Sequence, residues 1–438
     1  MIRVDTDVIE HELRQAKESE IFISQKDREY MIKTANGESS YFFTSNTGIA
    51  GRVFEGGKVG FSYRPGLEIK KIKEILMDAR ASLTYTHMKG AMVHGHTPSI
   101  DFQLKSSGKK INHNTVDKWF AFLTEKLTGT GVYLKKLYYL KDEGSYLLVN
   151  SNGVKGGGTH SFTALGLELG LKNGNGEISF LLNRLGPGDN ITGGNWIKEL
   201  QTLLQMNTVP FVKSTTLNCY LLLTPQAVAA LIYIFLSCLT SEVIYHKRSF
   251  IRLNNEKAFF GKELTIIENA KDNQIYTGTV DGEGTKKEEK TIIDQGMLCN
   301  IISDFFYGSR LGIASTASCW RDTYRNYPVV KGNAVAVSRG EKTINELLNS
   351  VNPVLLINDL LGIASGFNPF TGDFQITSTG YLWQKGEFTG KARLYLEGNL
   401  CLFFNSVLAK SKEREYGVDG SVYVPAFLFD QRPVKVLQ

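Results

Sequence analysis

Hydrophobic and polar residues alternate with two different periods along the first half of this 438-residue chain. Apolar residues recur at helical spacing within residues 4–18, 67–82 and 114–126, which predicts three amphipathic helices. Between these helices, short alternating or apolar runs bounded by polar turns predict strands. The predicted strands cover residues 20–24, 30–34, 38–43, 48–54, 58–63, 131–140, 144–150 and 160–170.

Polar and glycine-rich segments predict where these strands turn. Residues 55–57 read Glu-Gly-Gly between two strands and predict a hairpin, and residues 25–27 and 142–144 predict two further turns. The tract 153–158 is rich in glycine, but it lacks the G-x-x-x-x-G-K-[ST] sequence and the strand–loop–helix context of a phosphate-binding loop. We therefore expect a loop or bulge beside the strand at 160–170.

The second half of the chain opens on an apolar helix. A strand at residues 218–223 precedes a helix at about 226–240, and no charged residue occurs between Ser214 and Ser241. A membrane-spanning helix needs about 20 predominantly apolar residues, whereas the continuously apolar part, residues 227–236, is shorter. The pattern therefore favours a helix that is buried inside a domain, and we expect no membrane partner.

Beyond this helix, the pattern predicts a strand-rich region. A long amphipathic helix is predicted at residues 291–311 and a short one at 342–349, while residues 352–438 read as repeated strands separated by Gly and Asn turns. We therefore expect an α+β fold with two domains. The N-terminal domain of mixed helix and sheet covers residues 1–210, and the C-terminal strand-rich domain with the buried helix covers residues 211–438.

Composition and charge narrow the class of protein. The chain is 42% hydrophobic and 21% charged, which is typical of a globular protein, and it is too long for one ordinary core. The net charge of +6 comes from scattered basic residues rather than a basic stripe with aromatic residues, so we expect no nucleic-acid partner. Five widely spaced cysteines without a C-x-x-C motif, and a charged N-terminus unlike a secretory signal, indicate reduced thiols in a cytoplasmic protein.

Candidate catalytic residues are few. The chain contains no G-x-S-x-G sequence, and none of its cysteines has the context of a nucleophile. His94 and His96 flank a glycine, and His87 precedes them. Such histidines are typical of a surface loop, and an adventitious metal site or a partner contact is the alternative. Asp281 and Glu283 form a carboxylate pair in a turn, where residues i and i+2 need not converge on one substrate.

A run of short motifs fills the last third of the chain. In order, they are Asp281-Gly-Glu-Gly-Thr285, Ser315-Thr-Ala317, Thr371-Gly-Asp-Phe374, Ser378-Thr-Gly-Tyr381, Gly386-Glu-Phe388 and Glu397-Gly-Asn-Leu400. Each alone is a common turn sequence, in which glycine supplies positive φ and aspartate accepts backbone N–H bonds. Their order and spacing resemble the C-terminal domain of the TldD/PmbA family. Residues 48–63 and 149–153 resemble the N-terminal domain of the same family more loosely.

This resemblance implies a role in peptide breakdown. Family members assemble metallopeptidases for small unfolded peptides from a zinc-bearing TldD-like subunit and a zinc-free PmbA/TldE-like subunit. Family activities include removal of leader peptides and turnover of antitoxins, and the family also carries the older label "modulator of DNA gyrase". By resemblance, the candidate substrate-cleft or structural turn residues are Asp281, Glu283, Gly284, Thr285, Thr371, Gly372, Asp373, Gly398 and Asn399.

One helix distinguishes the two kinds of subunit. The zinc-bearing subunits hold the metal through H-E-x-x-x-H on a buried helix, where the glutamate acts as general base. Residues 245–250 resemble the Y-R-K-S-S-F stretch of the zinc-free subunit. Aligned outward from there, the two histidine positions fall on Tyr233 and Cys238, and the glutamate position falls on Ile234. No His or Glu occurs anywhere in the uncharged stretch around them.

We therefore expect a non-catalytic, PmbA/TldE-like subunit with no metal or cofactor of its own. Its expected partners are a TldD-like subunit that carries zinc, in a heterodimer, and a peptide substrate. Two alternatives remain, a non-enzymatic peptide-binding or scaffold homodimer, and an independent hydrolase with a metal at His87, His94 and His96. Ala317, where the family usually has glycine, and Glu397, where it usually has alanine, indicate a divergent branch.

Overall fold

The chain folds into two compact units, each of which gathers more than one segment of the sequence. The computed structural model describes residues 2–3, 6–93, 103–104, 113–173, 176–188, 196–253, 259–360, 362–417 and 419–437. Unit 1 comprises Met1–Ile191, Gln274–Glu288 and Ser303–Lys331. Unit 2 comprises Thr192–Asn273, Glu289–Ile302 and Gly332–Gln438. The mixture of helices and strands agrees with the predicted α+β class.

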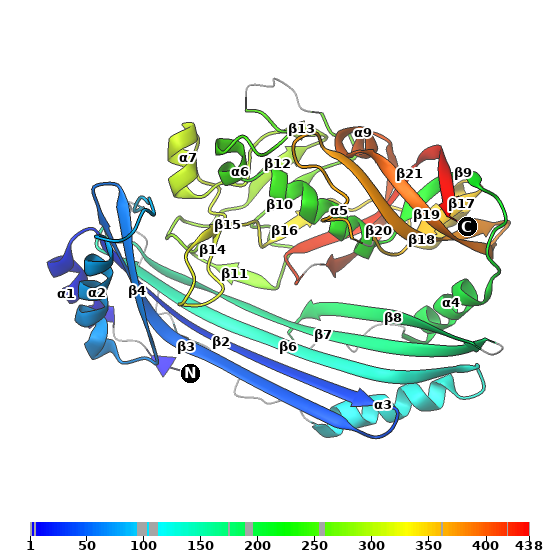
Figure 1. The fold of residues 1–438 in the computed structure, drawn as a ribbon, viewed down its shortest axis with the longest axis horizontal. Coiled ribbons are helices and arrows are strands. Elements are labelled where there is room, and N and C mark those ends of the chain that lie inside the picture. The colour runs from blue at the N-terminus through cyan, green and yellow to red at the C-terminus, as the bar shows by residue number, and fades with distance from the viewer. Residues whose placement is uncertain are drawn as a thin grey trace. The chain divides into compact units, whose positions relative to one another are not determined.

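Unit 1 is built on one long antiparallel sheet (Figure 1). Among the described residues its strand order is β11-β7-β6-β2-β3-β4, with β8 beside β7. The central strands pair over nearly their whole length. The strands are β2 Ser19–Thr34, β3 Ser39–Glu55, β4 Lys58–Pro65, β6 Val132–Asn150, β7 Lys155–Asn173, β8 Gly176–Pro187 and β11 Tyr276–Gly278.

Helices and short strand pairs complete unit 1. The described helices are α1 Thr6–Ala16, the 3-10 helix η1 Ile69–Lys71, α2 Ile72–Ser82, α3 His113–Leu127 and α7 Phe305–Leu311. The short pairs are β1 Ile2–Arg3 with β5 Gln103–Leu104, and β14 Cys319–Trp320 with β15 Val329–Val330. The three predicted N-terminal helices are therefore confirmed as α1, α2 and α3. The predicted hairpin is also confirmed, because Glu55 of β3 pairs with Lys58 of β4.

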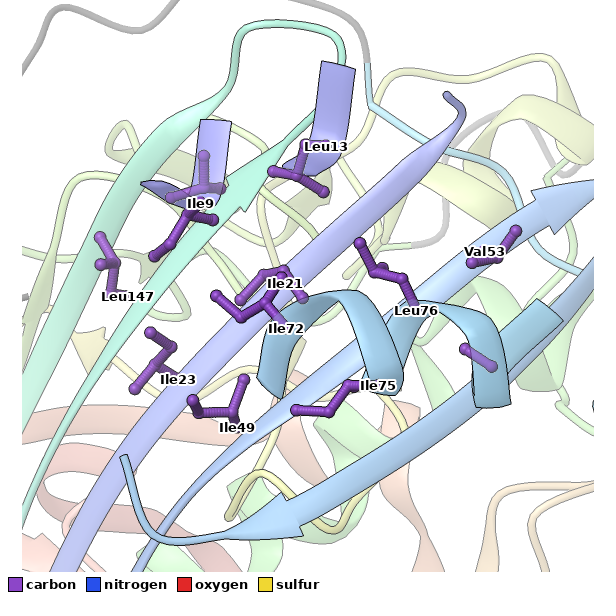
Figure 2. Packing of buried hydrophobic residues seen from close by; sticks show 12 residues of the cluster. Ile9, Leu13, Ile21, Ile23, Ile49, Val53, Ile72, Ile75, Leu76 and Leu147 are labelled. Carbon is purple, nitrogen blue, oxygen red and sulfur yellow. The ribbon is translucent and has the colours of Figure 1, made fainter. Parts of the chain in front are cut away.

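Helices α1 and α2 pack on one face of this sheet, as Figure 2 shows. Because side chains alternate along a strand, Ile21 and Ile23 of β2 face these helices, while Glu20 and Phe22 face the other side. The core consists of Ile9, Leu13, Ile21, Ile23, Ile49, Val53, Ile72, Ile75, Leu76, Ala79, Leu147 and Val149. Full burial of each large aliphatic side chain contributes about 1.5–3 kcal/mol. This core therefore fixes the register that turns Glu20 away from the helices.

Two turns that the sequence predicted do not occur in the described sheet. Strand β2 runs without interruption through residues 25–27, and β6 runs through residues 142–144. Their polar side chains pair with neighbouring strands instead of marking a turn, since Asp142 accepts hydrogen bonds from Arg28 and His160. Strand β3 likewise joins two predicted strands into one.

The opposite face of the sheet carries a second core at one end. It consists of Phe22, Ala50, Val93, Tyr146, Leu148, Val154, Val280 and Tyr324. Val280 and Tyr324 come from segments that the sequence assigned to the C-terminal domain. The division into two units therefore differs from the two consecutive domains, 1–210 and 211–438, because these apolar residues are buried against unit 1. The glycine tract takes part as well, since a Cβ at Gly156 would lie 2.8 Å from the side chain of Val280.

Unit 2 is dominated by a second sheet. Among the described residues its strand order is β13-β12-β10-β16-β21-β19-β18-β17-β9, with β20 beside β21. Strand β9 also pairs with β21, so that five of these strands form a closed ring. The strands are β9 Thr216–Leu223, β10 Ile266–Glu268, β12 Lys290–Asp294, β13 Met297–Leu298, β16 Val335–Val337, β17 Val354–Ile357, β18 Asp373–Gln384, β19 Glu387–Asn399, β20 Val407–Gly417 and β21 Val422–Leu437.

The apolar helix predicted near residue 230 is a buried helix of unit 2. It is α5, Pro225–Cys238, and the other described helices of the unit are α4 Trp196–Thr208, α6 Ser241–Tyr245, α8 Ile344–Ser350 and α9 Leu400–Asn405. In α5, Leu231, Ile232 and Phe235 are fully buried. None of the helices in the described ranges is both long enough and apolar enough to cross a membrane.

The predicted helix at 291–311 is wrong over most of its length. Residues 290–298 form the hairpin β12–β13, and only its C-terminal part is helical, as α7. Gln295 and Gly296 at the turn have φ values of 42° and 83°, which a right-handed helix cannot contain. The short helix at 342–349 is confirmed as α8, which Thr343 and Glu346 begin with a capping box.

Candidate functional site

Two opposite charges lie opposite each other on the second face of the sheet in unit 1. Glu20 of β2 and Arg52 of β3 are directly paired residues on adjacent strands. Arg52 Nε donates to Glu20 Oε1 at 2.9 Å, and Arg52 Nη2 donates to Glu20 Oε2 at 2.7 Å. Arg321, the residue after β14, donates through Nη2 to Glu20 Oε1 as well. The side chains of all three residues are at most 3% exposed, so one buried carboxylate bonds to two buried guanidinium groups.

The two guanidinium groups determine the ionisation of Glu20. Burial by itself would raise the pKa of Glu20, but the charges of Arg321 and Arg52 outweigh burial and hold that pKa below its usual value. Burial lowers the pKa of Arg321, and the like charge of Arg52 lowers it further. Nε and Nη1 of Arg321 make no hydrogen bond to any described residue, although its guanidinium lies 4.6 Å from the ring centre of Phe22. Arg321 is thus the less well satisfied of the two cations.

The acidic turn 281–285 belongs to the same unit and is folded around Asp281. Asp281 Oδ1 accepts hydrogen bonds from the backbone N–H groups of Glu283 and Thr285 at 3.0 and 2.9 Å, and Oδ2 accepts one from Cys319 at 3.1 Å. Gly284 has a φ of 93°, and a Cβ there would lie 2.8 Å from Val154. The turn therefore requires glycine at this position, and Asp281 ties it to the start of β14.

Glu283 connects the acidic turn to helix α7. Its Oε2 accepts a hydrogen bond from the backbone N–H of Phe305 at 3.0 Å, beside Asp304, whose carboxylate caps the same helix. Burial, followed by the negative charge of Asp304, raises the pKa of Glu283 to about 7. Burial and the charge of Glu283 raise the pKa of Asp281 to about 7 in the same way. Two carboxyl groups at the core of unit 1 therefore titrate near neutral pH.

A buried aspartate–histidine pair lies further along the same sheet face. His160 Nε2 lies 2.7 Å from Asp142 Oδ1, and the His160 ring stacks on Tyr276. Burial opposes ionisation of Asp142, but His160, Lys26 and Arg28 lower its pKa to about 2. Among the residues that the structure describes, no Ser, Thr or Cys side chain hydrogen-bonds to His160. The pair therefore orients a ring and does not activate a nucleophile.

The remaining candidate turn residues meet at one end of β18 and β19 in unit 2. Asp373 pairs with Asn399 in the ladder, and Asn399 Nδ2 donates to Asp373 Oδ1 and to the carbonyl of Thr371, both at 2.9 Å. Asn399 Oδ1 accepts from the backbone N–H of Cys401, which caps α9. Gly372 has a φ of 80°, and Gly398 lies exposed beside Asn399. The nine candidate residues thus form two separate groups, one in each unit.

These two groups differ in what they could contact. Asp281 and Glu283 are 0% and 3% exposed, so their carboxylates serve turn and core architecture rather than a substrate. Thr371 and Asp373 are exposed, and hydrogen bonds from Asn399 and Thr371 hold the pKa of Asp373 below its usual value. The exposed turn could receive a ligand, but its polar atoms are already used to lock β18 onto β19.

The residues on α5 do not fit a zinc site. Tyr233 is 36% exposed and Ile234 is half-buried, whereas Cys238 is 2% exposed. Burial raises the pKa of the Cys238 thiol to about 11, and a thiol must lose its proton to bind zinc. A phenol, an alkyl chain and a protonated thiol supply neither the ligands nor the general base of H-E-x-x-x-H.

The three candidate histidines cannot be judged as a group. His87 is exposed in the loop after α2, whereas His94 and His96 lie outside the described residues. Within the described ranges, no three His, Cys, Asp or Glu side chains are arranged so that they could hold a metal ion. A metal site at the three histidines therefore stays a hypothesis from the sequence.

The residue that replaces glycine in the Ser-Thr-Ala motif has an unfavourable backbone. Ala317 has a φ of 57° and is 2% exposed. Left-handed backbone costs a residue with a Cβ roughly 1–2 kcal/mol, and relief of that strain by glycine is partly offset by the larger entropy of glycine in the unfolded chain. We expect Ala317→Gly to raise the free energy of unfolding by up to about 1 kcal/mol, measured by denaturant titration.

The control for this substitution is Ala50→Gly. Ala50 is 1% exposed in the middle of β3 and has no positive φ. Glycine there loses a buried methyl group and strand propensity, so we expect destabilisation. If Ala317→Gly destabilised the protein as much as Ala50→Gly, the strain at Ala317 would be refuted.

Sequence reasoning missed the Glu20–Arg52–Arg321 cluster. The signal was present, because Glu20 precedes the apolar run Ile21–Ile23 and Arg52 interrupts an apolar strand. Charged residues of opposite sign in two apolar strands predict a buried pair if the strands are adjacent. The third member was not accessible, since 301 residues separate Arg321 from Glu20.

Comparison with known proteins places the chain among peptidase-related sequences. The model of the PmbA/TldA metallopeptidase C-terminal domain matches residues 216–435. An uncharacterized protein of Methanocaldococcus jannaschii is 24% identical over 200 residues, which are 45% of this chain and 47% of that protein. The zinc metalloprotease TldD homolog of Saccharolobus solfataricus is 24% identical over 153 residues, which are 34% of this chain and 33% of that protein. The matches thus span less than half of these curated relatives.

Solved structures with the same fold extend the similarity to nearly the whole chain. TldE from Thermococcus kodakarensis superposes with a TM-score of 0.85 at 16% identity, covering 98% of this chain and 100% of that one. A candidate modulator of DNA gyrase from Thermotoga maritima gives a TM-score of 0.79 at 14% identity, covering 98% and 99%. At such identities the likeness concerns the fold of the chain.

Proposed function

Because the chain belongs to the TldD/PmbA family, we propose that it is a non-catalytic, PmbA/TldE-like subunit of a two-component zinc metallopeptidase. The observation that carries this proposal is helix α5, where the positions aligned with H-E-x-x-x-H hold Tyr233, Ile234 and Cys238. These side chains supply neither two imidazole ligands nor a general base. The fold shared with TldE over nearly the whole chain supports the same assignment.

The proposed partner is a TldD-like chain that carries H-E-x-x-x-H and binds the zinc. Similarity to a relative named as a zinc metalloprotease TldD homolog supports this pairing. The proposed substrates are small unfolded peptides, including leader peptides and antitoxins. Extended peptides of many sequences can pair with a strand edge through main-chain hydrogen bonds. Such binding suits an enzyme that tolerates different substrates.

The decisive experiment compares the purified chain alone with the chain co-expressed with a TldD-like partner. Metal content and cleavage of a fluorogenic unfolded peptide are measured for both samples. We expect no stoichiometric zinc and no cleavage for the chain alone, and zinc-dependent cleavage by the pair. Stoichiometric zinc together with cleavage by the chain alone would overturn the proposal and direct attention to His87, His94 and His96.

Two matched variants locate the catalytic glutamate within the pair. Replacing the glutamate of H-E-x-x-x-H in the TldD-like partner should abolish cleavage, since it removes the general base. Replacing Tyr233 of this chain with Phe should leave turnover unchanged. An inactive pair, together with a chain that binds peptide and forms a stable homodimer, would instead support the scaffold alternative.

A further inference from the structure

One half of strand β3 forms a sheet edge that no described strand covers. Strand β2 pairs with β3 from Ser39 to Val53, whereas β4 pairs with β3 only from Gly48 to Glu55. In the described part of unit 1, residues 39–46 therefore have a strand on one side only. Figure 1 shows the short β4 beside one end of the much longer β3. We call residues 39–46 the open β3 edge.

The open β3 edge lacks the features that usually protect such an edge. Natural proteins place charged residues, proline or bulges on exposed edge strands, because main-chain N–H and C=O groups there recruit other strands. No Lys, Arg, Asp, Glu or Pro occurs from Ser39 to Gly51, and no bulge interrupts the pairing of β2 with β3. Phe42 and Phe43 on this edge are 56% and 47% exposed. An apolar, uncharged edge of this kind is suited to being covered by another strand.

The sequence of the edge also reads the same in both directions by side-chain class. Residues 39–45 are Ser-Ser-Tyr-Phe-Phe-Thr-Ser, with three aromatic residues between two hydroxyl pairs. Two such strands placed antiparallel about Phe42 would pair aromatic with aromatic residues and hydroxyl with hydroxyl residues. Both kinds of cross-strand pair stabilise a sheet by roughly 0.2–1 kcal/mol each. No charge is available on the edge to select a partner of opposite charge.

From this arrangement we propose that the open β3 edge pairs with the same edge of a second copy of this chain. The pairing is antiparallel about a two-fold axis, so that the sheets of the two copies become one continuous sheet. Directly opposite residues must lie on the same face of that sheet, so an axis perpendicular to it passes through a residue. An axis through Phe42 gives the class-matched register, with Tyr41 opposite Phe43 and Ser40 opposite Thr44.

The first test measures the mass of the purified chain in solution over a range of concentrations. We expect a dimer that dissociates on dilution. Phe42→Lys places two ammonium groups directly opposite each other at the axis and should weaken the dimer at least ten-fold. Because Phe42 is largely exposed, the variant should keep its fold, which circular dichroism checks. The matched control is Met77→Lys, which adds the same charge at a residue of α2 that is 63% exposed, and it should dimerise as the wild type does.

A second test reads the register. In a background where the exposed Cys299 is replaced by Ser, Phe42→Cys places two thiols opposite each other at the axis, where directly opposite Cβ atoms are about 4.5–5.5 Å apart. Mild oxidation should cross-link Phe42→Cys into a covalent dimer. Phe43→Cys faces Tyr41 of the other copy and should cross-link much less.

The outcomes separate the occupants that could cover the edge. A chain that stays monomeric at high concentration overturns the proposal, whether a peptide or another protein covers the edge instead. A dimer that Phe42→Lys and Met77→Lys leave equally intact overturns it too, since another surface then makes the contact. The proposal does not rest on the proposed peptidase function, because neither readout involves zinc or peptide cleavage.

Discussion

Replacing Glu20 with glutamine should lower the free energy of unfolding by about 3–5 kcal/mol, which is the range for breaking a buried ion pair by removing one partner. The substitution would keep the size of the side chain but would leave Arg52 and Arg321 without a compensating charge. The new amide N–H groups would also face guanidinium N–H groups, where the carboxylate oxygens now accept hydrogen bonds. Denaturant titration followed by near-UV circular dichroism measures the loss.

The matched variant removes one cation in place of the anion. Arg321→Met leaves Glu20 and Arg52 as a bidentate pair, and it deletes the two Arg321 donors that make no hydrogen bond to any described residue. We expect it to cost about 1 kcal/mol or less, because burying an apolar group in place of a charge is often neutral. Equal losses for Glu20→Gln and Arg321→Met would contradict the view that Glu20 compensates both arginines.

The second large effect is a dependence of stability on pH below neutrality. Asp281 and Glu283 have pKa values of about 7 in the folded protein, whereas carboxyl groups in an unfolded chain have pKa values of about 4. Between these values the folded state binds protons that the unfolded state has released. The free energy of unfolding should therefore fall as the pH rises from about 5 to about 7. Asp142, with its pKa of about 2, contributes stability that is lost only in acid, outside this window.

Glu283→Gln isolates the contribution of one group. Glutamine cannot ionise, and its carbonyl oxygen can still accept the N–H of Phe305. Relative to the wild type, the variant should gain stability as the pH rises from about 5 to about 7, by up to about 3 kcal/mol if the full shift is expressed. Unfolding curves for both proteins at several pH values measure the difference. Parallel dependences on pH for the two proteins would show that Glu283 does not titrate in this range.

Local patterns predicted the fold class, the N-terminal helices and the buried α5, because each of these depends on side chains close in sequence. The misread segments each depend on a distant partner. Asp142 inside β6 resembles a turn residue until Arg28 of β2 and His160 of β7 are placed beside it. Ile292 and Ile293 fit a helical stripe, but both are fully buried in strand β12. The pairing of β12 with β10 is not visible from local spacing.

The candidate site was predictable in part for the same reason. The acidic turn could be recognised because Asp281, Glu283 and Thr285 bond within five residues of one another. Its burial could not be recognised, since it follows from contacts with Cys319 and Phe305. Whether Thr371 and Asp373 meet a substrate depends on a second molecule, so neither the sequence nor the geometry of this chain decides it.

The segmented construction of unit 1 has a consequence for how the protein can be synthesised. The ribosome releases all of the long strands before the segments Gln274–Glu288 and Ser303–Lys331 exist. Until then Phe22, Tyr146 and Leu148 lack the apolar cover that Val280 and Tyr324 provide, and Glu20 has only one of its two arginines. An N-terminal domain usually folds first on the ribosome. Here the first domain to begin folding must wait for the chain to pass through unit 2 twice, so chaperone demand should peak midway through translation.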